Sequence, residues 1–141
     1  MDKIVSNLAE IRENFSLLTG QDKLLYIIDL SKKLEIIPEN YKTMDNRVKA
    51  CTSQTWIKLE NPEKINMVAD SESSVVKGLL RILQVAFDGA SNKEIKSFIN
   101  SFENPVQIFE WLNIGPTISS QRQNGFIGAI NIILEKTSDG K

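Results

Sequence analysis

The chain has 141 residues, 41% of them hydrophobic, and its 17 basic and 18 acidic side chains give a net charge of -1. That length suits one folded unit, so we expect a single domain over residues 1–141. The near balance of positive and negative charges disfavours nucleic acid and anionic membranes as partners. One cysteine and no histidine exclude an internal disulfide and disfavour zinc, haem and Cys-His catalytic sites.

The N-terminal part of the sequence predicts two helices. Apolar residues recur at spacings of three and four over residues 3–18 and again over residues 21–37, with Gly20 between the segments and Pro38 after them. This pattern predicts an αα-hairpin. The N-terminus alternates charged and apolar residues, and no segment approaches 18 apolar residues in a row. We therefore expect no secretory signal, no membrane-spanning helix and a cytoplasmic location.

The centre of the sequence changes to a period of two. Apolar and polar residues alternate over residues 55–60 and again over residues 64–70, and a turn at residues 61–63, Asn-Pro-Glu, separates the two segments. These segments predict an antiparallel β-hairpin. Residues 47–49, just upstream, are a candidate third strand.

Helical patterns return after the hairpin. The first predicted helix runs to Phe87 before Asp88-Gly89, and its Gly78 predicts a close approach of helix and sheet. The start signals for this helix and three later ones are Ser71, the Ser91-Glu94 capping-box pattern, Asn104 before Pro105, and the Ser120-Gln123 pair. This order predicts an α+β fold in which a small antiparallel sheet of about three strands packs against several helices.

The single cysteine, Cys51, lies in VKACTSQTWI, residues 48–57, between the candidate third strand and the hairpin. A lone cysteine is often a small, buried, inert hydrophobe. The polar neighbours of Cys51 and the nearby cation Lys49 instead favour a reactive thiolate. The residues alone leave both interpretations open.

Four segments together resemble the SufE family. VKACTSQTWI resembles the family motif in which Ser-Gln and then Trp follow a cysteine. DSESSVVKGLL, residues 70–80, is similar to the family's Asp-Ser-Asp-Ala segment and following helix, and SSQRQNGF, residues 119–126, to the segment before its last helix. Upstream, DKLLYIIDLSKKL is similar to the family's second helix. The departures from the family pattern are Ala50, Thr52, Glu72, Ser73 and Ser120.

The resemblance implies a SufE/IscU-like fold and a sulfur acceptor. Such a protein receives persulfide sulfur on its cysteine, here Cys51, from a SufS-like cysteine desulfurase, stimulates that enzyme, and passes the sulfur toward an iron-sulfur scaffold. The pyridoxal phosphate belongs to the partner, and this chain is expected to bind no cofactor or metal. Arg122 is a candidate for anion stabilisation or partner docking. The chain would be a covalent carrier and activator, not a stand-alone enzyme.

A noncatalytic adaptor, which binds and activates a desulfurase while Cys51 is incidental, is the alternative that stays open. A cysteine hydrolase would need a histidine base, and a thiol peroxidase would need a resolving thiol from outside the chain. A cluster scaffold would need more ligands than one cysteine supplies. The sequence disfavours these three.

Overall fold

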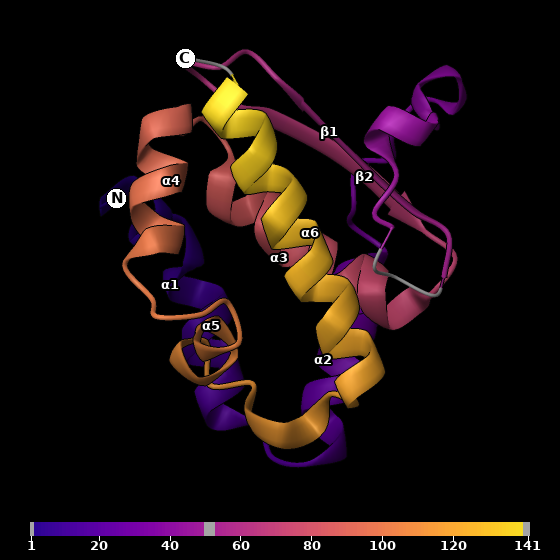
Figure 1. The fold of residues 1–141 in the computed structure, drawn as a ribbon. Coiled ribbons are helices and arrows are strands. Elements are labelled where there is room, and N and C mark those ends of the chain that lie inside the picture. The colour runs from indigo at the N-terminus through magenta and orange to yellow at the C-terminus, as the bar shows by residue number, and fades with distance from the viewer. Residues whose placement is uncertain (1, 50–52, 140–141) are drawn as a thin grey trace.

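The computed structural model describes residues 2–49 and 53–139, and Figure 1 shows their arrangement. Two helices come first, a two-stranded sheet follows, and the remaining helices come after it, with short 3-10 turns (η) in some of the connections. The elements in order are α1 (Asp2–Leu17), α2 (Gln21–Ser31), η1 (Glu39–Tyr41), η2 (Met44–Asn46), β1 (Thr55–Glu60), β2 (Asn66–Ser71), α3 (Ser74–Phe87), α4 (Asn92–Asn100), α5 (Gln107–Trp111), η3 (Gly115–Thr117) and α6 (Ser120–Asp139).

The predicted β-hairpin is confirmed. Strands β1 and β2 pair antiparallel, with Ile57 opposite Ala69, and both of these side chains are fully buried. Between the strands the N–H of Lys64 donates to the carbonyl of Asn61 over 3.0 Å, and Asn61 has a positive φ of 58°. Such a φ suits asparagine, whose short polar side chain tolerates the left-handed region. The alternating sequence pattern therefore selects the buried face of the sheet.

The predicted third strand at residues 47–49 is wrong as a strand. Arg47 makes one isolated antiparallel bridge to Trp56 of β1, and the N–H of Val48 donates to the carbonyl of Thr55 over 2.8 Å. The described sheet, with two strands, gains a second bridge at its other edge, where Ile36 pairs with Ala69. The α+β fold class is confirmed, with single bridges where a third strand was expected.

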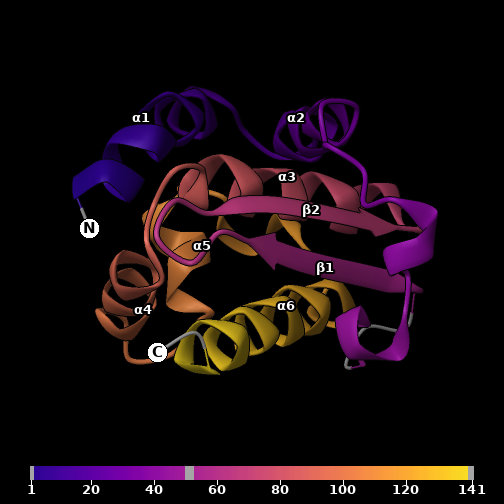
Figure 2. The ribbon, with the colours of Figure 1, turned by 90° about the horizontal axis from the view of Figure 1, so that it is seen from above.

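Helix α3 lies at the centre of the packing. It contacts α1, α2, α6 and β2, and Figure 2 shows α1 and α2 on the opposite side of α3 from α6. Gly78 is buried at the contact with α2, where an added Cβ atom would overlap the backbone oxygen of Ile27. The glycine therefore allows α3 to approach α2 closely. The sequence predicted instead that Gly78 would face the sheet, and this prediction was wrong.

Helix α2 ends at Ser31, six residues before the predicted end at position 37. The segment after it leaves the helix because the edge of β2 offers its backbone other partners. The N–H of Ile37 donates to the carbonyl of Ala69 over 3.0 Å, and the N–H of Ala69 donates to the carbonyl of Glu35 over 3.3 Å. Leu34 and Ile37 of the apolar pattern are buried in this non-helical segment, while Ile36 is exposed.

Two predicted helix starts are displaced. Ser73, not Ser71, caps α3, because Ser71 is the last residue of β2 and its hydroxyl bonds Thr55 at 2.8 Å. Ser119, not Ser120, caps α6, since its Oγ accepts from the N–H of Arg122 over 3.4 Å.

Of the other start signals, the capping box is confirmed, whereas α5 begins at Gln107 with Val106 at its N-cap, after the predicted start at Asn104. Ser91 and Glu94 form the reciprocal capping box of α4, in which each side chain accepts the other's backbone N–H. Asn104 accepts the N–H of Val106 at 3.0 Å just before α5. No helix in the described part of the chain is long and apolar enough to cross a membrane.

Candidate functional site

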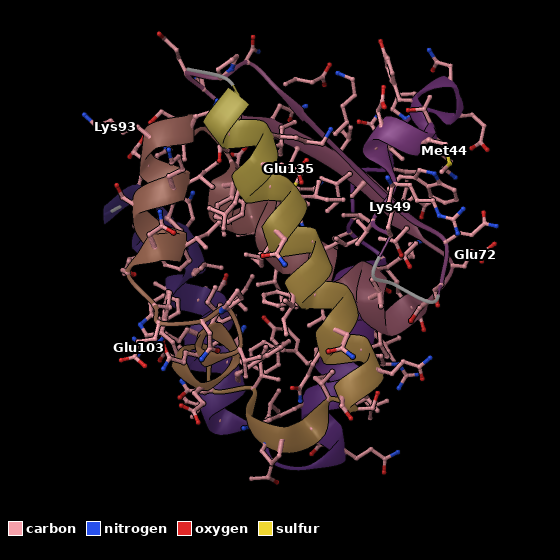
Figure 3. All side chains as sticks on the ribbon, in the orientation of Figure 1. Met44, Lys49, Glu72, Lys93, Glu103 and Glu135 are labelled. Atoms are coloured by element: carbon pink, nitrogen blue, oxygen red, sulfur yellow. The ribbon has the colours of Figure 1, made fainter. Side chains whose placement is uncertain are left out.

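The two sides of the cysteine motif are joined by a backbone hydrogen bond. The 2.8 Å bond between the Val48 N–H and the Thr55 carbonyl joins the residues on either side of residues 49–54, which we call the cysteine loop. Cys51, with Ala50 and Thr52, lies outside the described residues. Figure 3 labels Lys49, the last described residue before the cysteine, and Glu72, which neighbours the flank that follows it. The structure therefore places the two flanks of the cysteine motif, the first ending at Lys49 and the second beginning at Ser53.

The C-terminal flank of the loop is tied to the end of β2. The N–H of Glu72 donates to the carbonyl of Gln54 over 3.0 Å, and the Gln54 N–H donates to a carboxylate oxygen of Glu72 over 3.4 Å. One residue further on, the buried hydroxyls of Thr55 and Ser71 lie 2.8 Å apart. These contacts hold Ser53 and Gln54 close to the start of α3.

A hollow of about 490 Å³ opens beside this flank. Ser53 lines it from the cysteine loop, and Arg122 lines it from the first turn of α6. The hollow is also lined by Glu72, Ser73, Ser74, Val76, Ser119 and Gln121. The structure thus brings the predicted site residue Arg122 to the same hollow as the loop that carries Cys51.

Two helix N-termini converge on the hollow. Ser73 and Ser74 belong to the start of α3, and Ser119 caps the start of α6. The N-terminus of a helix carries a partial positive charge and free N–H donors, so it favours an anion nearby. Glu72 is the one carboxylate among the described lining residues, and it accepts from Gln54. The polarity of the hollow suits a thiolate or another small anion.

Arg122 supplies a full positive charge at the same place. Its side chain is exposed, and within residues 2–49 and 53–139 no carboxylate lies within ion-pair distance of it. A guanidinium carries a permanent positive charge. It is therefore available to an anion that enters the hollow.

A partly buried ion pair braces the chain upstream of the loop. Lys42, just after η1, contacts Asp70 of β2 at 2.8 Å and Glu39 at 3.1 Å, and its ammonium lies 5.0 Å from the ring centre of Trp56. The hydrogen bond to Asp70, and then that to Glu39, raises the pKa of Lys42 above its ordinary value. Lys77 of α3 approaches the other Asp70 oxygen at 3.7 Å. Asp70 and Trp56, which face each other across the hairpin, therefore hold the segment that leads to Cys51.

No cluster of three or more His, Cys, Asp or Glu residues that could hold a metal ion occurs among the residues that the structure places. The polar groups that line the hollow are serine hydroxyls, the Gln121 amide, Glu72 and Arg122.

The fold and the site define a small α+β protein that presents a cysteine loop beside a hollow of positive polarity. A profile of the SufE family, described as an Fe-S metabolism associated domain, matches residues 9–137. This match spans most of the sequence, so the chain belongs to the SufE family, as the motifs predicted.

Named relatives agree with this assignment. The chain is 31% identical over 115 residues to the cysteine desulfuration protein SufE of Wigglesworthia glossinidia brevipalpis. This match covers 79% of this chain and 80% of the relative. It is 27% identical over 130 residues to the sulfur acceptor protein CsdE of Escherichia coli (strain K12), with 90% of this chain and 85% of the relative covered.

A solved structure matches the fold. The solution structure of a hypothetical protein from Thermus thermophilus has a TM-score of 0.67 to this structure, and the match covers 94% of each chain. At 15% identity this likeness shows the fold alone.

Sequence reasoning missed the two serine caps at the hollow. It placed the caps at Ser71 and Ser120, and so did not bring the N-termini of α3 and α6 to the cysteine loop. The available signal was the pair of neighbouring serines at each start, Ser73-Ser74 and Ser119-Ser120, each of which offers two candidate caps.

Proposed function

We propose that this protein is a sulfur acceptor that takes persulfide sulfur from a cysteine desulfurase on Cys51. The observation that carries the proposal is the position of the family's cysteine motif. Its loop flank and Arg122 line one hollow, on which the N-termini of α3 and α6 converge. Family membership and the relatives named for cysteine desulfuration and sulfur acceptance support the same activity.

The proposed transfer is an exchange at sulfur. The Cys51 thiolate attacks the outer sulfur of the partner's cysteine persulfide, so that a new sulfur-sulfur bond forms at Cys51 Sγ. The sulfur-sulfur bond of the partner breaks, and the partner's cysteine leaves as a thiolate. The transferred sulfur keeps its oxidation state and its proton, so no oxidant, reductant or metal is consumed.

The polarity of the hollow supports this step. A thiolate, and not a thiol, is the attacking species, and a nearby positive charge or helix N-terminus favours it. In this role Arg122 and the first turns of α3 and α6 stabilise the Cys51 thiolate before the transfer, and the persulfide anion once the transferred sulfur has lost its proton. The serine hydroxyls of the hollow are further hydrogen-bond donors to the same anions.

The proposed partners follow from the family. The sulfur donor is a SufS-like cysteine desulfurase whose own pyridoxal phosphate releases sulfur from cysteine, and the recipient is an iron-sulfur scaffold. This chain needs no cofactor for the exchange, because both reacting groups are cysteine sulfurs. When Cys51 removes the persulfide sulfur from the desulfurase cysteine, that cysteine is free for another turnover, so the desulfurase is stimulated.

The test uses the whole chain with a cysteine desulfurase and cysteine. We expect sulfide release in the presence of a reductant to rise when the protein is added, and peptide mass spectrometry to find one added sulfur on Cys51. The variant Cys51→Ser should lose both effects.

Two outcomes would contradict the proposal. Stimulation that persists in full with Cys51→Ser would favour the adaptor, in which the cysteine is incidental. An unmodified Cys51 in a protein that binds the active desulfurase would exclude the carrier. Circular dichroism of Cys51→Ser controls for folding, and a small loop substitution should leave the spectrum unchanged.

A further inference from the structure

A second depression borders the cysteine loop on its other flank. It has a volume of about 500 Å³ and lies between η2 and the C-terminal half of α6. Figure 3 shows its labelled members Met44, Lys49 and Glu135. We call it the η2-α6 groove, and it is lined by Met44, Asp45, Arg47, Lys49, Gly128, Asn131, Ile132, Glu135 and Lys136.

The floor of the groove offers apolar contact. Met44 is 65% exposed, and Ile132, which also lines the groove, is half-buried. An exposed methionine is flexible and polarisable, which suits a surface that adapts to a protein partner. Gly128 of α6 also lines the groove, but it is buried. The hollow on the other flank is more polar, with mainly serine and charged residues in its lining.

The groove carries an excess of positive charge among its lining residues. Arg47, Lys49 and Lys136 line it, and none of them forms an ion pair with a placed residue. The Lys136 ammonium donates instead to the amide oxygen of Asn46 over 2.9 Å. Its acidic neighbours, Asp45 and Glu135, leave an excess of one positive charge among the lining residues.

Lys136 is held in an unfavourable setting for its charge. Burial first, and then the charge of Lys58, lowers the pKa of Lys136, although Asp45 and Glu135 oppose this shift. A further carboxylate from outside the chain would offset the desolvation of this ammonium. The groove is therefore complementary to an acidic group that the chain does not itself provide.

The groove is continuous with the proposed acceptor loop. Lys49 lines it and lies two residues before Cys51 in the sequence. A partner that brings its persulfide to Cys51 must therefore cover surface next to this groove. The cysteine motif thus has a polar hollow on one side and a partly apolar, cationic groove on the other. The sulfur transfer can use the hollow while the partner is recognised by the groove.

We propose that the η2-α6 groove docks an acidic segment of the cysteine desulfurase that carries an apolar side chain onto Met44. This inference rests on the proposed function, and it assigns recognition to a surface outside the hollow of Arg122. The carboxylates of that segment pair with Lys49 and Lys136, and the apolar side chain covers the floor. Electrostatic pairing of this kind speeds encounter and weakens with salt.

The test measures binding to the desulfurase in a Cys51→Ser background, so that sulfur transfer does not contribute. Lys49→Glu should raise Kd about tenfold at low ionic strength, since a charge reversal replaces attraction by repulsion. Glu135→Lys should lower Kd about threefold for the opposite reason. Both side chains are exposed, so neither change should disturb folding. Both effects should shrink as salt is added.

Lys93→Glu is the matched control, because it makes the same charge change on an exposed face of α4 that lies away from the groove (Figure 3). Its Kd should stay within a factor of about two of the parent. The inference is overturned if Lys49→Glu and Glu135→Lys leave Kd unchanged, or if Lys93→Glu weakens binding equally. A concentration-dependent dimer that Lys49→Glu abolishes would assign the groove to a second copy of this chain.

The two proposals fail in different ways. If the parent protein binds the desulfurase and Cys51 takes sulfur, but the groove variants bind normally, only the docking surface is wrong. If Cys51 takes no sulfur although the groove variants change Kd as expected, the acceptor chemistry is wrong and the docking surface stands.

Discussion

The packing around α3 and the rim around the cysteine loop are held by different kinds of contact. Around α3 the contacts are apolar and close, and Gly78 lets α3 approach α2 with no room for another atom. At the rim, short hydrogen bonds and the ion pair of Lys42 with Asp70 hold partly exposed segments beside two open depressions. Stability should therefore depend mainly on the first region, and sulfur transfer on the second.

The largest expected effect on stability is at Gly78. In an ordinary helix interior, alanine is more stable than glycine by about 0.5–1 kcal/mol. Here the Cβ atom of Gly78→Ala would overlap the backbone of Ile27, which flexible side chains cannot relieve. We expect the free energy of unfolding to fall by about 2–3 kcal/mol in urea denaturation.

The control for this change is Ser97→Ala on the exposed face of α4, which should change stability by less than about 0.5 kcal/mol. The sulfur-transfer rate of folded Gly78→Ala should match that of the parent. A stability gain in Gly78→Ala would show that α2 and α3 are not closely packed there, and it would break the comparison.

The largest expected effect on transfer, short of removing Cys51, is at Arg122. Arg122→Met should slow the maximal rate of sulfur uptake about tenfold, because one charge near an anion in a partly screened site is worth on the order of 1 kcal/mol. Arg122→Lys keeps the charge and should recover part of the rate. Because the side chain is exposed, urea denaturation should show no loss of stability.

Iodoacetamide labelling separates the two roles of Arg122. If it stabilises the thiolate, the pH midpoint of Cys51 alkylation rises in Arg122→Met without any partner present. If it docks the partner, this midpoint stays and the half-saturating desulfurase concentration rises. If Arg122→Met has the parent's uptake rate, alkylation midpoint and half-saturating desulfurase concentration, Arg122 has no role in sulfur transfer.

The smallest effect is expected at Lys42, at the border of the two regions. Lys42→Met should lower the free energy of unfolding by about 1 kcal/mol or less, because the pair with Asp70 is only partly buried. The pKa of Lys42 is raised in the folded state, so its contribution is complete below the ordinary value of 10.5 and disappears as pH rises through the folded-state pKa.

The difference in unfolding free energy between the parent and Lys42→Met should therefore shrink above pH 10.5. Urea denaturation at neutral pH and at high pH measures it. A difference that is constant over this range would assign the loss to packing on Trp56 and not to the ion pair with Asp70.

Local signals predicted the parts of the fold that depend on neighbouring residues. The hairpin and the capping box of Ser91 and Glu94 are formed by residues close in sequence, and both were predicted. The end of α2 and the caps of α3 and α6 were misplaced. After α2, backbone groups of residues 35 and 37 bond to Ala69, which is distant in sequence. At α3, the hydroxyl of the predicted cap Ser71 bonds to Thr55 instead. At α6 two adjacent serines competed, and a sequence pattern does not decide between them.

The candidate site was predictable in its parts but not in its arrangement. The motif around Cys51 and the segment with Arg122 could be recognised from residue types and order. Their meeting at one hollow depends on how α6 packs across α3 and β1, which no local pattern reports. The η2-α6 groove likewise joins Lys49 and Lys136, which are far apart in the sequence.

The most direct test of the central claim is a single-turnover transfer. A desulfurase loaded with persulfide and freed of cysteine is mixed with this protein, and intact-mass spectra follow both chains with time. The account predicts that the desulfurase loses the mass of one sulfur atom while this chain gains it at Cys51, and that Cys51→Ser gains none. Persulfide that stays on the desulfurase, or sulfur that appears equally on Cys51→Ser, would contradict it.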